Sequence, residues 1–123
     1  MHQAIKTSLL LLFFALGLSA RSIHHTLSMP EPHTHLFEVE MRLEGARGTQ
    51  VVALPVWTPG SYLVREYARN VQDISARSED DSVLKIKKID KNHWEVKAKG
   101  SQDIIISYRV YAYEHSVRTS YLN

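Results

Sequence analysis

Histidines are the first residues whose type and spacing could do chemistry in this sequence, because imidazole nitrogens bind metals and exchange protons near neutral pH. The chain has seven of them and no cysteine. His33 and His35 are two positions apart, so both side chains would lie on one face of an extended segment. Structural zinc needs four ligands, and catalytic zinc needs three protein ligands plus water. Two histidines supply neither set, so the sequence predicts no metal and no cofactor in this chain.

Carboxylate pairs are the second candidate for chemistry. Glu38 with Glu40, and Asp80 with Asp81, could act as acid and base only if a cleft perturbed them. The first pair falls on the polar side of an alternating strand, and the second falls in a polar turn. No serine has the G-x-S-x-G context of a nucleophile, and no glycine-rich loop could cradle a phosphate. The sequence therefore predicts no catalytic residue, and an enzyme in its own right is the least favoured class.

The segment 57–70 is the most unusual stretch of the chain. Pro59 presets φ at the first central position of a turn and Gly60 allows positive φ at the second, which predicts a type II turn. Ser61 could then cap a short helix, so one short helix or turn segment is expected near 61–70. Apolar residues with the spacing i, i+3, i+4, i+7 would share one face of that helix: Val64, Tyr67, Ala68 and Val71.

Two interpretations of this segment remain open. Glu66 precedes Arg69 by three residues, a spacing that allows an ion pair, so a salt-bridged surface helix is one interpretation. The other is a docking surface, because arginine and aromatic side chains dominate interface hot spots. The candidates for docking, or for bordering a substrate entrance, are Trp57, Pro59, Gly60, Tyr62, Arg65, Glu66 and Arg69.

The elements that must position this segment have the period of two that is typical of β-strands. Strands are expected at 23–29, 37–44, 51–56, 72–78, 83–89, 94–98 and 103–113, with turns at Gly45 to Gly48 and at 90–92. The nearly continuous apolar run 51–56 suggests a strand covered on both sides. These patterns predict an all-β fold of six to seven short strands, either an antiparallel β-sandwich or a strongly curved sheet.

The first twenty residues are set apart from this domain. Lys6 precedes the apolar run Leu9–Leu18, which resembles a secretory signal and is shorter than the roughly 20 apolar residues of a membrane span. We therefore expect a signal peptide at 1–20, cleaved after Ser19 or Ala20, and a domain at 21–123. The product would be exported to the periplasm or the extracellular space, with an uncleaved anchor as the alternative.

The charge balance disfavours nucleic acid as a partner. The formal net charge is only +2. The densest basic cluster, Lys85, Lys87, Lys88 and Lys91, faces acidic residues in an expected hairpin rather than forming a concentrated basic surface.

Several stretches of the sequence resemble one family. Trp57-Thr58-Pro59-Gly60-Ser61-Tyr62 followed by Arg65-Glu66-Tyr67-Ala68-Arg69-Asn70 is similar to the signature of the N-terminal domain of the glycyl aminopeptidase family of zinc metallopeptidases, peptidase family sixty-one. The resemblance continues in Met29-Pro30-Glu31-Pro32 with His35, in Lys88-Ile89-Asp90-Lys91 with Trp94, and in Tyr108-Arg109-Val110-Tyr111-Ala112 with Ser116-Val117-Arg118.

The resemblance implies a β-rich domain that precedes a thermolysin-like catalytic domain and a PDZ domain in full-length members. The family's zinc lies in an H-E-x-x-H helix, and no such string occurs here, so zinc is expected only in the missing catalytic domain. This chain alone is expected to be no catalyst, to stop before the catalytic domain, and to pack against that domain in cis. Trp57 and Tyr62 would be apolar anchors, and Glu66 could bind the amino group of a peptide substrate. The alternative is a free-standing secreted module that binds a peptide, a glycan or a protein.

Overall fold

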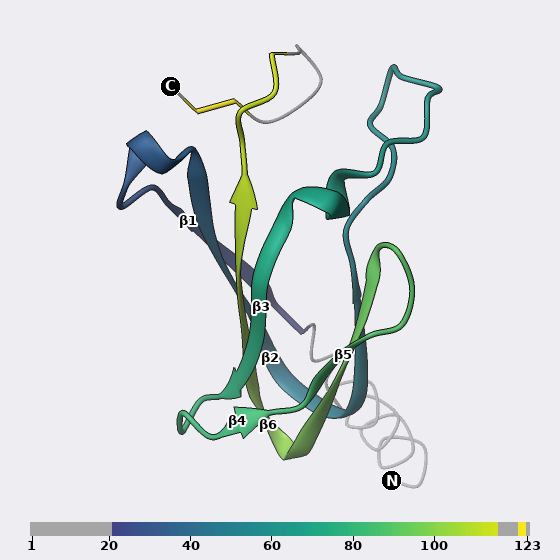
Figure 1. The fold of residues 1–123 in the computed structure, drawn as a ribbon. Coiled ribbons are helices and arrows are strands. Elements are labelled where there is room, and N and C mark those ends of the chain that lie inside the picture. The colour runs from purple at the N-terminus through teal and green to yellow at the C-terminus, as the bar shows by residue number, and fades with distance from the viewer. Residues whose placement is uncertain (1–20, 116–120, 123) are drawn as a thin grey trace, which may run out of the picture.

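A computed structural model describes residues 21–115 and 121–122. They form one six-stranded antiparallel sheet with the order β1-β2-β6-β3-β4, in which β5 also pairs with β6 (Figure 1). The strands are β1 (Ile23–Ser28), β2 (Leu36–Ala53), β3 (Val71–Ser78), β4 (Val83–Leu84), β5 (Ile86–Lys88) and β6 (His93–Tyr111). Two single-turn 3₁₀ helices complete the fold, η1 (Pro32–Thr34) and η2 (Tyr67–Asn70). The all-β prediction is confirmed, and the strongly curved sheet is the alternative that the chain adopts.

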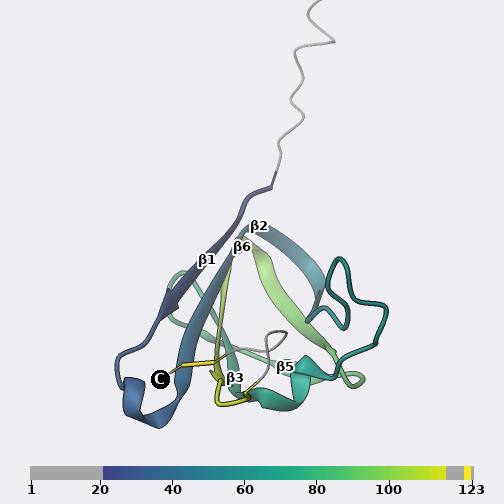
Figure 2. The same cartoon turned by 90° about the horizontal axis from the view of Figure 1, so that it is seen from above.

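The curvature comes from the two longest strands, β2 and β6, which bend together. Residues 36–43 of β2 pair with 104–111 of β6, and residues 49–53 pair with 93–97, with bulges between the two stretches. Gly100 lies at the bend of β6 with φ +90°, a conformation that L side chains rarely adopt. Seen from above, the two arms of the sheet diverge from the bend (Figure 2). The expected turn at Gly45 to Gly48 is thus a bend within one strand, and the expected strands 94–98 and 103–113 are also continuous.

The core lies between the two arms. Its buried members come from β2, β3, β4 and β6: Ala46, Ala76, Leu84, Val96, Ile104 and Ile106. Burying one side chain of the size of Ile106 contributes about 2 kcal/mol, so this small cluster supplies much of the stability. Trp94 is also buried. The prediction that 51–56 is covered on both sides is wrong, because Val51 is 56% exposed on the outer face.

An ionic network fastens the bend from outside. Asp103 Oδ1 accepts the Gly45 N–H at 2.9 Å, and Asp103 Oδ2 accepts Arg42 Nε at 2.9 Å and Nη2 at 2.7 Å. The Gly45 N–H and the Arg42 guanidinium together hold the pKa of Asp103 below its usual range. Arg42 also donates to Glu79 at 3.0 Å. The network therefore links β2, β6 and the turn after β3.

The expected hairpin turn at 90–92 is confirmed. Asp90 Oδ1 accepts the backbone N–H groups of Asn92 and His93 at 2.9 and 2.8 Å, which closes the turn between β5 and β6. The expected signal peptide at 1–20 lies outside the described residues. Among residues 21–115 and 121–122, no helix is long and apolar enough to cross a membrane.

Candidate docking surface

The segment 57–70, called the docking loop below, connects β2 to β3 and is tied down at its base. The Leu54 N–H donates to the Asn92 carbonyl at 2.9 Å, and Asn92 Nδ2 donates to the Leu54 carbonyl at 3.0 Å. The Arg65 N–H donates to the Val56 carbonyl at 2.7 Å, which closes residues 57–64 into a compact loop. The loop therefore has a closed base of defined geometry.

The tip of the loop contains the expected turn. Ser61 N–H donates to the Thr58 carbonyl at 3.1 Å, and Gly60 has φ +83° at the second central position. Both features are those of a type II turn. The proline and glycine that precede Ser61 thus fix the direction in which the tip projects.

Of the two alternatives for 61–70, the chain adopts the turn segment: no helix starts at Ser61, and only the single turn of η2 forms. In an α-helix the Arg65 N–H would donate to the Ser61 carbonyl, but here it closes the loop by donating to Val56. Nucleating a helix of fewer than ten residues is costly, so this competing bond decides the outcome. Ser61 does not act as a cap, and its buried Oγ has no hydrogen-bond partner. Val64, expected on a buried face, is 68% exposed.

The charged residues of the loop pair with other parts of the chain rather than with each other. Glu66 Oε1 accepts Lys91 Nζ at 2.8 Å from the β5–β6 turn, and this hydrogen bond lowers the pKa of Glu66. Arg69 Nη2 donates to Glu114 at 2.5 Å, beyond the end of β6. The expected side-chain pair of Glu66 with Arg69 is therefore replaced by two contacts that anchor the loop on both sides.

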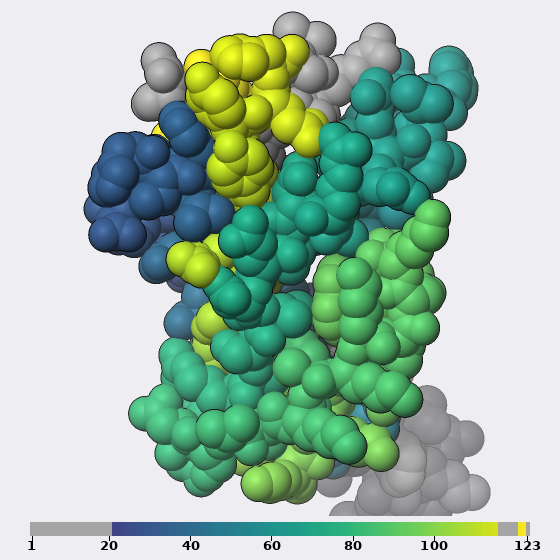
Figure 3. All heavy atoms as spheres, viewed as in Figure 1, coloured from purple at the N-terminus to yellow at the C-terminus, as the bar shows by residue number. Residues whose placement is uncertain are grey.

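Apolar side chains gather at the exposed tip of the loop. Tyr62 is 97% exposed, Leu63 58%, Val64 68% and Trp57 48%. In Figure 3 the loop, in teal at the upper right, protrudes above the β5–β6 hairpin in green. Sequence reasoning singled out Trp57 and Tyr62 but missed Leu63 and Val64, because the helical pattern placed Val64 on one helix face with Tyr67 and Ala68. The run Tyr62-Leu63-Val64 directly after a turn was the signal.

A hollow of about 460 Å³ lies between the docking loop and the β5–β6 turn. Val56, Val64 and Arg65 line it from the loop, and Lys88 and Lys91 line it from the hairpin. The Arg65 Nε atom is buried and has no hydrogen-bond partner. The structure thus brings two of the lysines of the hairpin next to the loop arginine.

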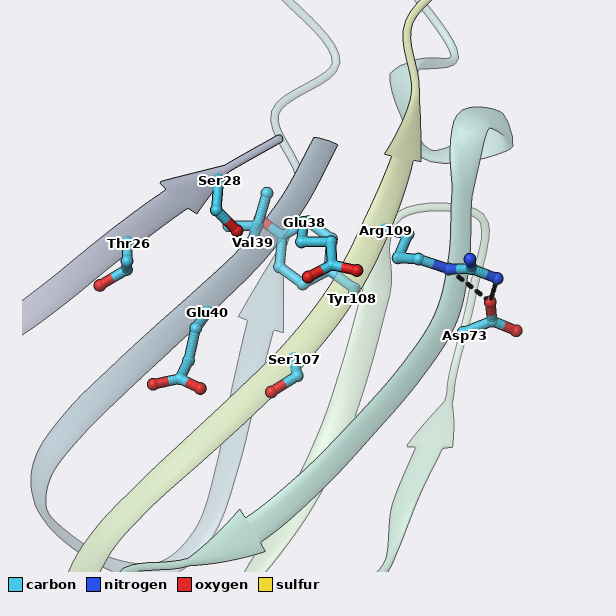
Figure 4. A pocket seen from close by; sticks show the side chains of 9 residues that line it. All are labelled: Thr26, Ser28, Glu38, Val39, Glu40, Asp73, Ser107, Tyr108 and Arg109. Carbon is cyan, nitrogen blue, oxygen red and sulfur yellow. Dashed lines mark hydrogen bonds and ion pairs between the residues drawn. The ribbon is translucent and has the colours of Figure 1, made fainter. Parts of the chain in front are cut away.

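A second, polar hollow of about 420 Å³ lies on the face of β1, β2, β6 and β3 (Figure 4). Glu38 and Glu40 project into it from β2, and Arg109 projects from β6. Arg109 Nε donates to Asp73 Oδ2 at 2.8 Å, and Glu40 accepts Arg77 at 3.0 Å. These pairs are exposed, as the alternation of β2 predicts for its polar side.

The six histidines of the described ranges do not assemble a metal site. His33 lies within η1 and His35 follows it in the left-handed conformation, so the expected common strand face is wrong. The His35 Nδ1 atom lies 2.7 Å from the Leu122 carbonyl oxygen, and its ring stacks at 4.1 Å from Tyr113. His115 also contacts Tyr113. Across the described part of the chain, no group of three or more His, Asp or Glu side chains could hold a metal ion.

These features define a class: a curved β-sheet domain with a fixed, apolar-tipped loop and, within the described residues, no set of metal ligands. The model of the Peptidase M61 N-terminal domain matches residues 24–123, and the chain belongs to this family. The resemblance of the signature residues is thereby confirmed.

A solved structure agrees with this assignment. The chain is similar to the crystal structure of an aminopeptidase N family protein from Idiomarina loihiensis, with 34% identity and a TM-score of 0.76. The match covers 83% of this chain and 17% of that protein, so the chain spans about one sixth of the longer relative. No curated protein matches the sequence.

Proposed function

We propose that this domain is the non-catalytic N-terminal part of an exported aminopeptidase, and that it packs against the peptidase domain through the docking loop. The observation that carries the proposal is the cluster of exposed apolar side chains at the loop tip, Trp57, Tyr62, Leu63 and Val64. Exposed apolar residues in such a group are typical of an interaction surface. The Idiomarina relative, described as an aminopeptidase N family protein and far longer than this chain, supports the proposed partner.

Six of the seven candidate residues, all except Arg65, have a role in this proposal. Trp57 and Tyr62 are the apolar anchors, and the Pro59-Gly60 turn holds them in place without a large entropy cost on docking. Glu66 and Arg69 brace the loop through Lys91 and Glu114. The catalytic zinc would be supplied by the peptidase domain, because the H-E-x-x-H string of the family's zinc site does not occur in this sequence.

The mass of the native product is the first test of the docking role. An antibody raised against residues 21–123 should detect a polypeptide several times the mass of this chain, because the peptidase domain is expected in the same polypeptide. A band at the mass of this chain, or slightly below it, would instead favour a free-standing secreted module.

Export is tested on the same product. Removal of the signal peptide after Ser19 or Ala20 would leave Ala20 or Arg21 as the first residue. N-terminal sequencing of the product recovered outside the cytoplasm should find one of these two residues. Recovery of the intact N-terminus in the cytoplasm would contradict export.

A substitution at the tip tests the interface directly. In the longer polypeptide, Tyr62→Ser should weaken domain packing by about 2 kcal/mol, because a buried aromatic anchor is lost. The measurement is the rate of limited proteolysis between the two domains, together with the thermal midpoint. Val83→Ser is the matched control, because Val83 is 81% exposed on β4, far from the docking loop in sequence. Equal effects of the two changes would contradict docking through the loop.

The peptide substrate forms the finer part of the proposal. Glu66 holds an exposed carboxylate beside the apolar tip, and a carboxylate at a peptidase entrance could bind the free amino group of a peptide. In the longer polypeptide, Glu66→Gln should raise KM for peptides roughly tenfold and change kcat little. If both stability and peptide cleavage stayed unchanged, the role of Glu66 would be abandoned.

A further inference from the structure

Arg65 differs from the other arginines of the sheet and its loops. Each of the others donates to a side chain: Arg42 to Asp103, Arg47 to Ser101, Arg69 to Glu114, Arg77 to Glu40 and Arg109 to Asp73. Arg65 has no such partner among the described residues, and its Nε is buried without an acceptor. A buried donor on a charged group that lacks an acceptor is costly. The Arg65 side chain therefore has hydrogen-bond donors that no described residue satisfies.

The surroundings of Arg65 favour an anion. The hollow that it lines contains four cationic side chains, Arg65, Arg69, Lys88 and Lys91, and one carboxylate, Glu66. Glu66 pairs with Lys91, and Arg69 pairs with Glu114. Within the described part of the chain, Arg65 and Lys88 are left as the two positive charges of the hollow without a carboxylate partner. Lys88 Nζ lies over the Trp94 ring, 5.3 Å from its centroid, which positions the ammonium group.

We propose that the hollow between the docking loop and the β5–β6 turn binds a peptide carboxylate, with Arg65 and Lys88 as the binding residues. The planar guanidinium matches the two oxygens of a carboxylate, and Val56 and Val64 supply an apolar wall for the carbon chain behind it. Glu66 at the hollow disfavours a doubly charged phosphate more than a singly charged carboxylate. The inference deepens the proposed docking role, because the carboxylate would belong to a peptide segment that reaches the loop.

The site can be tested without any peptidase domain. The full chain is purified from the cell as it accumulates there, with or without the segment 1–20. It is labelled with ¹⁵N and titrated with four small probes. N-acetyl-glutamate amide offers only a side-chain carboxylate, and glycylglycine offers a terminal one. N-acetyl-glutamine amide is the uncharged match, and inorganic phosphate is the competing anion. The backbone amides of Val64, Lys88 and Asn92 report on the hollow.

We expect at least one carboxylate probe to shift these three amides saturably, and the tighter of the two identifies the source of the carboxylate. Arg65→Gln should weaken this binding roughly tenfold or more, because charge-assisted hydrogen bonds are lost. Arg65→Lys should weaken the binding less, since lysine keeps the positive charge but lacks the paired, planar N–H donors of the guanidinium. Arg47→Gln removes the same charge from an exposed site on β2 and should change the affinity less than about twofold.

A second substitution tests whether a loss of binding in Arg65→Gln comes from a change in the conformation of the docking loop. Lys88→Gln alters the hairpin side of the hollow and should also weaken binding severalfold while leaving the docking loop amides in place. The proposal is overturned if neither carboxylate saturates, if the glutamine probe binds equally well, if phosphate binds more tightly, or if Arg65→Gln and Arg47→Gln act alike. Such a result would leave the apolar docking role standing, because the Tyr62→Ser test does not depend on Arg65.

Discussion

The Asp103 carboxylate accepts the hydrogen bonds that link β2 to β6 on the outside of the bend. Its two oxygens receive the Gly45 N–H and the Arg42 guanidinium, which belong to the strand on the other side of the bend. These donors hold the pKa of the carboxyl below its usual range in the folded chain. In the unfolded chain both donors are lost, so the two states differ in proton affinity.

This difference predicts a loss of stability in acid. Because the folded pKa of Asp103 is depressed, its contribution is present above the unfolded pKa of about 4 and is lost as the pH falls through the folded pKa. The free energy of unfolding should therefore decrease below about pH 4, as measured by urea unfolding at a series of pH values. Asp103→Asn should reduce this slope and lower stability at pH 7. An unchanged slope in the variant would show that other carboxylates carry the effect.

At this scale the sequence predicted residue types better than their partners. It marked Trp57 and Tyr62 as apolar anchors, and the structure exposes both side chains. It could not separate Arg65 from Arg69, which have equivalent places in the local pattern. The partner of Arg69 is Glu114, which lies 45 positions away, and no local spacing encodes that contact.

At the scale of elements, the bend of β2 and β6 is the feature that organises the sheet. Alternation correctly predicted the polar face of β2, which carries Glu38 and Glu40. Alternation did not distinguish a bend within a strand from a turn between strands, because glycine with positive φ occurs in both. The pairing of β2 with β6 on both sides of the bulges shows that this is a bend. The missing helix has a similar cause, since a backbone bond to Val56 outweighs the side-chain pattern.

Gly100 offers a test of the bend. Gly100 has φ +90° and open space around its Cα, so a substitution there is opposed by backbone strain rather than by a clash. Gly100→Val should lower the free energy of unfolding by about 1–2 kcal/mol, measured by urea unfolding. Lys99→Val, which puts the same side chain on the exposed neighbouring position, should change it by less than about 0.5 kcal/mol. Equal effects would mean that β-branching, and not the backbone conformation, is responsible.

At the scale of the whole molecule, the buried core and the exposed tip make separate contributions. The core is held between the arms of the sheet, whereas the tip of the docking loop lies outside it. Stability of the fold and association with a partner should therefore respond to different substitutions. Neither the curvature nor this separation follows from composition, because both depend on which distant strands pair.

Self-association of the chain tests whether fold stability and association depend on different residues. Without a partner domain, the apolar tip should promote reversible association, which static light scattering detects as a rise in mean mass with concentration. Tyr62→Ser should weaken this association about tenfold or more while leaving the urea midpoint unchanged. Ile106→Ala should do the reverse and cost about 2–4 kcal/mol of stability. A monomeric wild-type chain at all concentrations would favour a finished, free-standing module.

The two tryptophans give this chain a pair of optical reporters. Trp94 is 5% exposed within the sheet, with the Lys88 ammonium over its ring, whereas Trp57 is 48% exposed at the docking loop. Fluorescence from Trp94 should be blue-shifted and shielded from iodide until the chain unfolds, whereas that from Trp57 should be red-shifted and quenched by iodide. A Trp57→Phe chain would then report unfolding through the buried ring and a Trp94→Phe chain would report occupancy of the loop, so the two processes can be followed by emission without any added label.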